Sequence, residues 1–293
     1  MKELYIKIRL ILKEMRVWQW VKNFLVFAPL VFSSNAANPH LLMVALFAFI
    51  SLCFASSGVY VLNDIADKEA DRTHSVKKKR PIASGEISVK NGTFLGISLL
   101  ILAGCIGVFV SSILTILVAI YALANILYSK TLKHQPILDI LFVALLYLFR
   151  VYIGAFVINV PVSTWLFLTT FSASLFLVTG KRRAELVSAG KEEAIYSRKV
   201  LNDYNEKFLD HVVVSSLTLT VVFYSLYSIL VHRSYFAVSI IFVVFGAFRY
   251  LFLVFAKNDG EEPEKILFHD KQILASGLLL AIYVLIVLYT HIL

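Results

Sequence analysis

The chain contains nine long apolar stretches, and this feature limits its fold more than any other. Each stretch approaches the roughly 20 residues that an α-helix needs to cross a bilayer. Backbone polar groups inside a bilayer must be paired within the protein, so such stretches fold as helices. The stretches cover residues 18–36, 41–62, 91–110, 112–128, 137–158, 163–180, 211–231, 235–256 and 272–292. We expect an all-α integral membrane protein, with nine transmembrane helices in a single domain over residues 1–293.

The composition agrees with a polytopic membrane protein and excludes several other classes. Of the 293 residues, 59% are hydrophobic, which is too many for a soluble domain. The net charge of +9 is typical of cytoplasmic loops near anionic headgroups, so we expect no nucleic-acid partner. Cys53 and Cys105 both lie inside apolar stretches, which argues against a disulfide framework or a thiolate metal site.

The distribution of Lys and Arg predicts the orientation of the chain. Nearly all of them precede the first apolar stretch or follow the even-numbered ones, whereas the opposite loops carry only Arg233. By the positive-inside rule we expect the N-terminus and the long polar loops in the cytoplasm, and the C-terminus outside the cell membrane. Arg150 and Arg249 lie within stretches, where each should face either a structural partner or a substrate. The basic, amphipathic residues 2–16 lack a cleavage site and are expected to stay and lie in the membrane interface.

An acidic segment follows the second stretch and is the first candidate site. Asp64, Asp67 and Asp71 are spaced i, i+3 and i+7, so they share one face of an α-helix. Clustered carboxylates suit Mg²⁺, which takes one or two of them and fills its other positions with waters and substrate phosphates. Glu69 falls on the opposite side and should meet solvent. The alternative interpretation is an ordinary charged loop whose bases only set the topology.

Two basic segments complete the candidate site. Lys79 and Arg80 end a basic run that could neutralise phosphate oxygens left uncovered by a metal. After the sixth stretch, Lys181, Arg182 and Glu185 have the spacing of one helical face. Together these segments would suit a diphosphate ester of a sugar or lipid. The alternative for the second segment is an interfacial charge cluster at a helix end.

At these residues the chain resembles the UbiA-type membrane prenyltransferase superfamily. That family carries an Asn-Asp-x-x-Asp-x-x-x-Asp motif and a downstream Arg-Pro-x-x-Ser-Gly element. The matching residues here are Asn63, Asp64, Asp67 and Asp71, followed by Lys79, Arg80, Pro81, Ser84 and Gly85. The resemblance spans nearly the whole chain and implies a UbiA-like bundle of nine helices with cytoplasmic polar loops. It also implies that Asp64, Asp67 and Asp71 bind Mg²⁺ and act in catalysis.

One departure from the family pattern indicates the branch. Prenyl diphosphate users carry a second Asp-rich motif after the sixth span, where this chain has Lys181, Arg182 and Glu185. With WQWVKN, YSKTLKHQ, KRRAE and GEEPE, the chain is similar to the decaprenyl-phosphate phosphoribosyltransferase branch. That similarity implies phosphoribosyl pyrophosphate as donor and a polyprenyl phosphate lipid as acceptor. The substrate-binding residues that it implies are Lys22, Asn23, Asn63, Lys79, Arg80, Tyr128, Lys130, Lys133, Lys181, Arg182 and Glu185.

Two other functions stay open at this point. A prenyl diphosphate-dependent aromatic prenyltransferase would need a second acidic cluster, which Glu185 with Glu192 or Glu193 could supply. A lipid transporter would need acids or broken helices near the bilayer midplane, whereas the acids here gather at cytoplasmic ends. No general base is required for a phosphate acceptor, so His74 and His134 have no assigned role. The sequence is compatible with a homo-oligomer and leaves the oligomeric state open.

Overall fold

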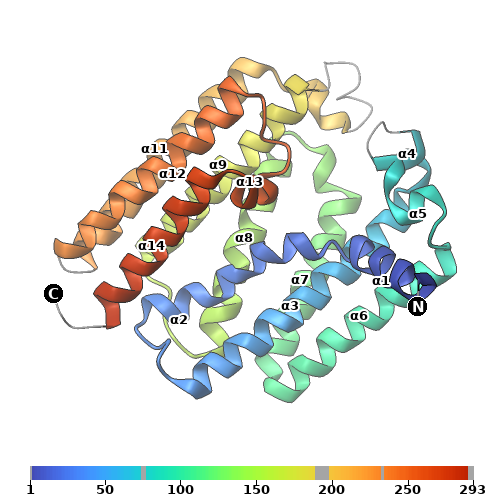
Figure 1. Ribbon diagram of the computed structural model, residues 1–293, viewed down its shortest axis with the longest axis horizontal. Coiled ribbons are helices and arrows are strands. Elements are labelled where there is room, and N and C mark those ends of the chain that lie inside the picture. The colour runs from blue at the N-terminus through green and yellow to red at the C-terminus, as the bar shows by residue number, and fades with distance from the viewer. Residues whose placement is uncertain (1, 74–76, 189–197, 232–233, 290–293) are drawn as a thin grey trace. The chain divides into compact units, whose positions relative to one another are not determined.

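The structure, a computed structural model, describes residues 2–73, 77–188, 198–231 and 234–289 (Figure 1). Over those ranges every regular element is a helix, which confirms the all-α prediction. Seven helical segments are long and apolar enough to cross a membrane. They contain α3 (Pro39–Ala66), α6 (Val89–Val110), α7 (Ser112–Lys130), α8 (Leu138–Val157), α11 (Glu206–Leu230), α12 (Ser239–Ala256) and α14 (Lys271–Tyr289). The protein is therefore an integral membrane protein.

The two other expected spans have a different character. Residues 18–36 contain η1 (Val17–Phe27), a 3₁₀ helix, followed by the short α2 (Ala28–Phe32). A 3₁₀ segment of this length is unusual, because its hydrogen-bond geometry is poorer than that of an α-helix. Residues 164–180 lie in α9 (Thr164–Ser188), which is not among the seven and which continues into the charged residues Lys181, Arg182, Arg183 and Glu185. Nine spans remain a prediction.

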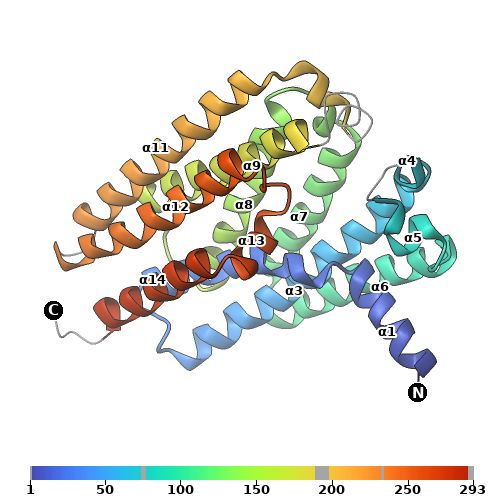
Figure 2. The same ribbon diagram turned by 45° about the horizontal axis from the view of Figure 1, so that its top comes forward.

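The chain divides into two compact units. The first unit comprises Met1–Leu30, Asn38–Thr131 and Arg150–Asn159. Helices α3 and α6 lie side by side in it, as both views show (Figure 2). Their approach depends on glycine, because a Cβ on Gly58 would lie 2.9 Å from the carbonyl oxygen of Gly96. The Ser51 hydroxyl also donates to the carbonyl of Ala103 at 2.8 Å.

The polar segments of the first unit flank these long helices. Helix α1 (Lys2–Glu14) packs against α3 and α5 (Pro81–Ser84). Between α3 and α5 come α4 (Lys68–Thr73) and η2 (Lys77–Lys79). Helices α6 and α7 are separated by Ser111, an extended residue whose Oγ accepts a hydrogen bond from the Leu114 amide. The boundary between the third and fourth apolar stretches therefore coincides with a helix cap.

The second unit comprises Val31–Ala37, Leu132–Phe149 and Val160–Leu293. Within it α9 packs along α11, and α12 packs along α14. Its short elements are η3 (Leu132–His134), η4 (Lys199–Asp203), η5 (Ser234–Val238) and α13 (Pro263–His269). One apolar core joins Leu201 and Leu209, both fully buried, to residues of α8 and α9. This core supports the charged second half of α9.

Candidate functional site

The acidic motif lies across the junction between α3 and α4. Asp64 is in the last turn of α3, Asp67 caps that helix, and Asp71 lies in α4. The amides of Asp67 and Asp71 still donate to carbonyls four residues earlier, at 2.9 and 2.8 Å. Asp64 and Asp71 are buried, whereas Asp67 is half-buried. Glu69 is 77% exposed and pairs with Arg72, which confirms the prediction that it meets solvent.

Two arginines hold the buried carboxylates of this motif. Arg80 Nη1 donates to Asp64 Oδ1 at 3.0 Å and to Asp71 Oδ2 at 2.5 Å. Arg16 Nη2 donates to Asp64 Oδ1 and Oδ2 at 2.5 and 2.8 Å. The Arg16 guanidinium also lies over the ring of Tyr60, 5.2 Å from its centroid. One Arg80 nitrogen therefore contacts both aspartates, which brings Asp64 and Asp71 together as the helical spacing predicted.

A third carboxylate, from α1, belongs to the same place. Glu14 is 1% exposed, and its carboxyl group lies beside the carboxyl of Asp64 and the backbone of Ile82. Burial and the nearby charge of Asp64 raise the pKa of Glu14 to about 7. Burial also raises the pKa of Asp71, although the guanidinium of Arg80 opposes the shift. We call Glu14, Asp64, Asp71, Arg16 and Arg80 the acidic cluster.

The donor set of the acidic cluster fits a divalent cation such as Mg²⁺. Mg²⁺ binds oxygen ligands, usually one or two carboxylates completed by waters and substrate phosphates. Asp64 and Asp71 supply two carboxylates that contact a single nitrogen atom. Among the described residues, no three acids, histidines or cysteines are arranged as a complete metal cage. The cluster is therefore suited to a cation that arrives with phosphate rather than to a closed structural site.

Other predicted residues of the first unit have different surroundings. Lys22 Nζ donates to Gln19 at 3.3 Å. Asn23 is buried, and its Oδ1 accepts from Arg150 Nε at 2.9 Å. Arg150 also donates to the hydroxyl of Tyr121 at 2.6 Å, so this intramembrane arginine has structural partners. Asn23 thus links helices of the unit. The remaining candidates here are the half-buried Asn63 and Tyr128 and the exposed Lys79 and Lys130.

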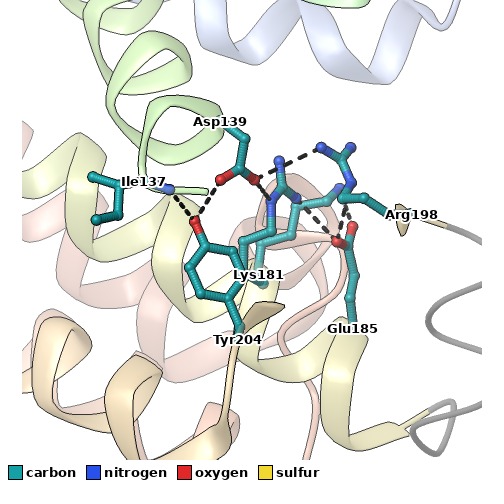
Figure 3. A network of polar contacts seen from close by, with 7 residues as sticks. Ile137, Asp139, Lys181, Glu185, Arg198 and Tyr204 are labelled. Carbon is teal, nitrogen blue, oxygen red and sulfur yellow. Dashed lines mark hydrogen bonds and ion pairs between the residues drawn. The ribbon is translucent and has the colours of Figure 1, made fainter. Parts of the chain in front are cut away.

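A second charged site lies in the second unit, around the start of α8 and the end of α9 (Figure 3). Asp139 is fully buried, and its Oδ2 accepts from Arg182 Nε at 2.8 Å. Arg182 Nη1 also donates to Glu185 Oε2 at 3.0 Å. The Tyr204 hydroxyl donates to Asp139 Oδ1 at 2.6 Å and accepts from the amide of Ile137 at the same distance. Each Asp139 oxygen therefore has a donor.

Two further cations surround this buried core. Lys181 Nζ lies 3.9 Å from Glu185 Oε1, and its side chain is 31% exposed. Arg198 lies 3.8 Å from Glu185 and 3.9 Å from Asp139, with 25% of its side chain exposed. The structure thus gathers the three residues predicted to share a helical face and adds others. We call Asp139, Lys181, Arg182, Glu185, Arg198 and Tyr204 the basic network.

The prediction from sequence missed several members of both sites. Glu14 was assigned to an amphipathic surface stretch, and Asp139 was counted within an apolar span. A carboxylate in the first turn of an otherwise apolar helix is costly unless it is paired, and this was the available signal for Asp139. Lys133 is half-buried and His134 exposed in η3. His74, Glu192 and Glu193 lie outside the described residues.

Comparison with known proteins gives the family. The sequence profile of the UbiA prenyltransferase family matches residues 24–274. The decaprenyl-phosphate phosphoribosyltransferase of Mycolicibacterium smegmatis is 33% identical over 89% of this chain and 86% of its own length. The enzyme of the same name from Corynebacterium glutamicum is 30% identical over 94% and 87%.

A solved structure agrees with this assignment at the level of fold. A UbiA homolog from Archaeoglobus fulgidus, bound to GPP and Mg²⁺, superposes with a TM-score of 0.70 at 18% identity. The superposition covers 94% of this chain and 96% of that one. The family profile matches most of the length of this chain, so the chain belongs to the UbiA prenyltransferase family.

Proposed function

We propose that the protein transfers 5-phosphoribose from phosphoribosyl pyrophosphate to a polyprenyl phosphate and releases pyrophosphate, with Mg²⁺ as cofactor. Two curated relatives are named for this activity, and their sequence similarity to this chain extends over most of its length and of their own. This similarity supports the proposed activity. The observation that carries the choice of donor is the charge balance of the basic network. Its three cations outnumber its two carboxylates, as expected for binding phosphate rather than a second metal.

The acidic cluster is the proposed site for the diphosphate. Asp64 and Asp71, with Asp67 at the helix junction, would hold Mg²⁺, whose charge would stabilise the leaving pyrophosphate. Arg16 and Arg80, which hold the aspartates in the structure, could donate to phosphate oxygens instead. Lys79 is exposed beside Arg80 and adds a further cation.

The basic network is the proposed site for a further phosphate group. Lys181, with 31% of its side chain exposed, is the most exposed cation of the network and can reach a ligand, whereas Arg182 is 3% exposed and engaged by Asp139 and Glu185. We therefore assign direct contact to Lys181 and a positioning role to Arg182. Lys130 and Lys133, three residues apart in the sequence, are further cations proposed to bind substrate. The sequence suggested the same substrate-binding role for Lys181 and Arg182, whereas we now propose a different role for each.

The acceptor needs no general base, because a phosphate monoester is already anionic at neutral pH. One of its oxygens forms a bond to C1 of the ribose while the bond from C1 to the diphosphate oxygen breaks. The electron pair of that bond leaves with pyrophosphate. Positive charge at the ribose resembles the oxocarbenium character of glycosyl transfer, and nearby carboxylates and phosphates would stabilise it.

The membrane arrangement is part of the proposal. We infer nine spans in one domain, with the N-terminus and the polar loops in the cytoplasm, from the distribution of Lys and Arg. Helix α1 exposes Tyr5, Ile6 and Ile8, as expected for a helix lying in the interface. A lipid phosphate entering sideways from the bilayer could follow this helix to the acidic cluster, because Glu14, the last residue of α1, belongs to that cluster.

The product lipid identifies the activity. Purified protein would be incubated with Mg²⁺, polyprenyl phosphate and either phosphoribosyl pyrophosphate or a prenyl diphosphate with an aromatic acid. We expect a lipid whose mass corresponds to phosphoribosylated polyprenyl phosphate, and only with the first donor. A prenylated aromatic acid would instead assign the protein to prenyl diphosphate chemistry.

A further inference from the structure

The turn that leads into α8 contains a strained residue. Ile137 has a φ of 67°, in the left-handed region, and it is the one β-branched residue with a positive φ in the part of the chain that the structure describes. This conformation is costly for a β-branched residue, so it persists only where the surrounding contacts hold it. The side chain of Ile137 is 52% exposed, so its packing contributes little. The turn must therefore be held through its backbone.

The hydroxyl of Tyr204 spans this turn. It accepts a hydrogen bond from the Ile137 amide at 2.6 Å and donates to Asp139 Oδ1, two residues later, at the same distance (Figure 3). The Ile137 carbonyl accepts hydrogen bonds from the amides of Ile140 and Leu141, at 3.1 and 2.9 Å, in the first turn of α8. Tyr204 thus contacts both the strained turn and the buried carboxylate at the start of the helix.

The ring of Tyr204 is itself fixed by packing. It is 4% exposed and lies in one apolar core with the fully buried Leu201 and Leu209. It also stacks on Phe208, with ring centroids 5.9 Å apart and 9° between the planes. These contacts belong to the ring and not to the hydroxyl. Tyr204→Phe should therefore keep the core and remove only the two hydrogen bonds.

The contacts of Asp139 connect this turn to the exposed part of the basic network. Asp139 Oδ2 accepts from Arg182 Nε at 2.8 Å, and Arg182 Nη1 donates to Glu185 Oε2 at 3.0 Å. Glu185 Oε1 in turn lies 3.9 Å from Lys181 Nζ. Because Tyr204 engages Oδ1 of Asp139, the other oxygen of that carboxylate faces Arg182. A displacement of the carboxylate would therefore reach Lys181 through two charged neighbours.

We propose that Tyr204 is a positioning residue for donor binding. Its hydroxyl stabilises the strained turn at Ile137 and orients Asp139, which places Lys181 for contact with a phosphate group. The inference rests on the proposed function, because Lys181 is the residue assigned to the donor. Tyr204 itself does not touch the substrate. Removing its hydroxyl should weaken binding of the donor and leave binding of the lipid phosphate unchanged.

The kinetics of Tyr204→Phe and of a matched control test this role. The KM for phosphoribosyl pyrophosphate should rise about 2-fold to 10-fold, as for the loss of one uncharged hydrogen-bond donor, with kcat and the KM for polyprenyl phosphate little changed. Tyr224→Phe is the control, because that buried hydroxyl also donates one hydrogen bond, to Ser239 Oγ at 2.8 Å, outside the basic network. It should lower the unfolding temperature and leave the donor KM unchanged. An equal rise of the donor KM in both variants would overturn the positioning role.

Substitution of the strained residue separates positioning from general stability. Glycine adopts a positive φ without steric cost, so Ile137→Gly should preserve the turn without the Tyr204 hydroxyl. Added to Tyr204→Phe, it should restore part of the donor affinity and of the unfolding temperature. Ile137→Ala removes nearly the same side chain but keeps the Cβ, and should restore clearly less. Equal effects of Gly and Ala would overturn the role of the turn. If Tyr204→Phe does not fold, the double variant with Ile137→Gly should fold, and failure of both overturns the proposal.

Titration calorimetry with phosphoribosyl pyrophosphate and Mg²⁺ separates this inference from the proposed function. Absence of binding by the wild type overturns the donor assignment, and the role of Tyr204 toward that donor fails with it. Equal affinity of the wild type and Tyr204→Phe overturns only the role of Tyr204. The expected result is weaker binding by Tyr204→Phe, with Tyr224→Phe binding like the wild type.

Discussion

The acidic cluster and the basic network are built from the same kinds of residue but have opposite charge balance. In the acidic cluster three carboxyl groups face two guanidiniums, and Glu14 lies beside Asp64 with its pKa raised to about 7. In the basic network two carboxylates face three cations, and both Asp139 oxygens accept hydrogen bonds. Under the proposed function, the excess charge of each cluster, more than its residue types, determines whether it binds a cation or an anion.

The two sites also differ in how their central pair is protected. Asp139 and Arg182 are nearly inaccessible, with side chains 0% and 3% exposed. Arg16 and Arg80, by contrast, keep 16% and 27% of their side chains exposed while holding Asp64. Arginines that remain partly exposed can exchange a carboxylate for a phosphate at lower desolvation cost. We expect substitutions in the acidic cluster to affect turnover and those at the centre of the basic network to affect stability.

The largest effect should come from Asp64→Asn. This change removes the carboxylate that both arginines share and little packing, so turnover should fall by on the order of 100-fold or more. Product lipid quantified by mass under saturating Mg²⁺ measures the loss. Glu69→Gln is the control and should retain most activity. An Asp64→Asn enzyme with nearly normal turnover would remove the acidic cluster from the chemistry.

The next effect concerns Asp139→Ala and stability. The substitution leaves Arg182 buried without its main acceptor, which costs about 3 to 5 kcal/mol in comparable buried pairs. Thermal unfolding in detergent should show a large drop. Arg198→Ala provides the control, because its contacts are long and partly exposed and should contribute about 0 to 1 kcal/mol. Equal drops in unfolding temperature for Asp139→Ala and Arg198→Ala would contradict the distinction between the buried centre and the partly exposed edge of the basic network.

Lys181→Ala should weaken donor binding rather than stability. A charge-assisted hydrogen bond to phosphate contributes about 1.5 to 3 kcal/mol, so the KM for phosphoribosyl pyrophosphate should rise about 10-fold to 100-fold. The KM for the lipid phosphate should change little. Titration calorimetry with phosphoribosyl pyrophosphate and Mg²⁺ checks the same affinity without turnover. A variant with unchanged donor affinity would show that the exposed lysine serves only its ion pair with Glu185.

The sequence allowed prediction of local features but not of contacts between distant segments. Helical spacing correctly associated Asp64 with Asp71, and Lys181 with Glu185, because residues three to seven apart are near one another on a helix. The same spacing treated Asp67 as equivalent, although α3 ends there. Its role as a metal ligand stays a prediction.

The missed residues depend on tertiary packing. Glu14 reaches Asp64 only because α1 packs on α3 and α5, and no periodicity in residues 2–16 reveals that contact. Asp139 meets Tyr204, 65 residues later, through the packing of the second unit. Hydropathy also predicted a span at residues 18–36 without distinguishing the 3₁₀ helix that fills much of it. Patterns along one helix cannot report such partners.

The smallest expected effect is a dependence of stability on pH that comes from Glu14 in the acidic cluster. Burial and Asp64 raise the pKa of Glu14 from 4.5 to about 7, so the folded protein holds a proton that the unfolded chain has released. Stability from this group is full below about pH 4.5 and is lost as the pH rises through about 7. The slope from one proton cannot exceed about 1.4 kcal/mol per pH unit.

Unfolding temperatures measured with a chelator between pH 5 and pH 7.5 would show this decline in the wild type. Glu14→Gln should flatten it, because the amide carries no titrating proton. Arg198→Ala, in the basic network, should leave it unchanged, since the carboxylate of Asp139 keeps its two direct donors. A decline that persists in Glu14→Gln would mean that the unbalanced charge of the acidic cluster lies on another carboxylate, of which the buried Asp71 is the first to test.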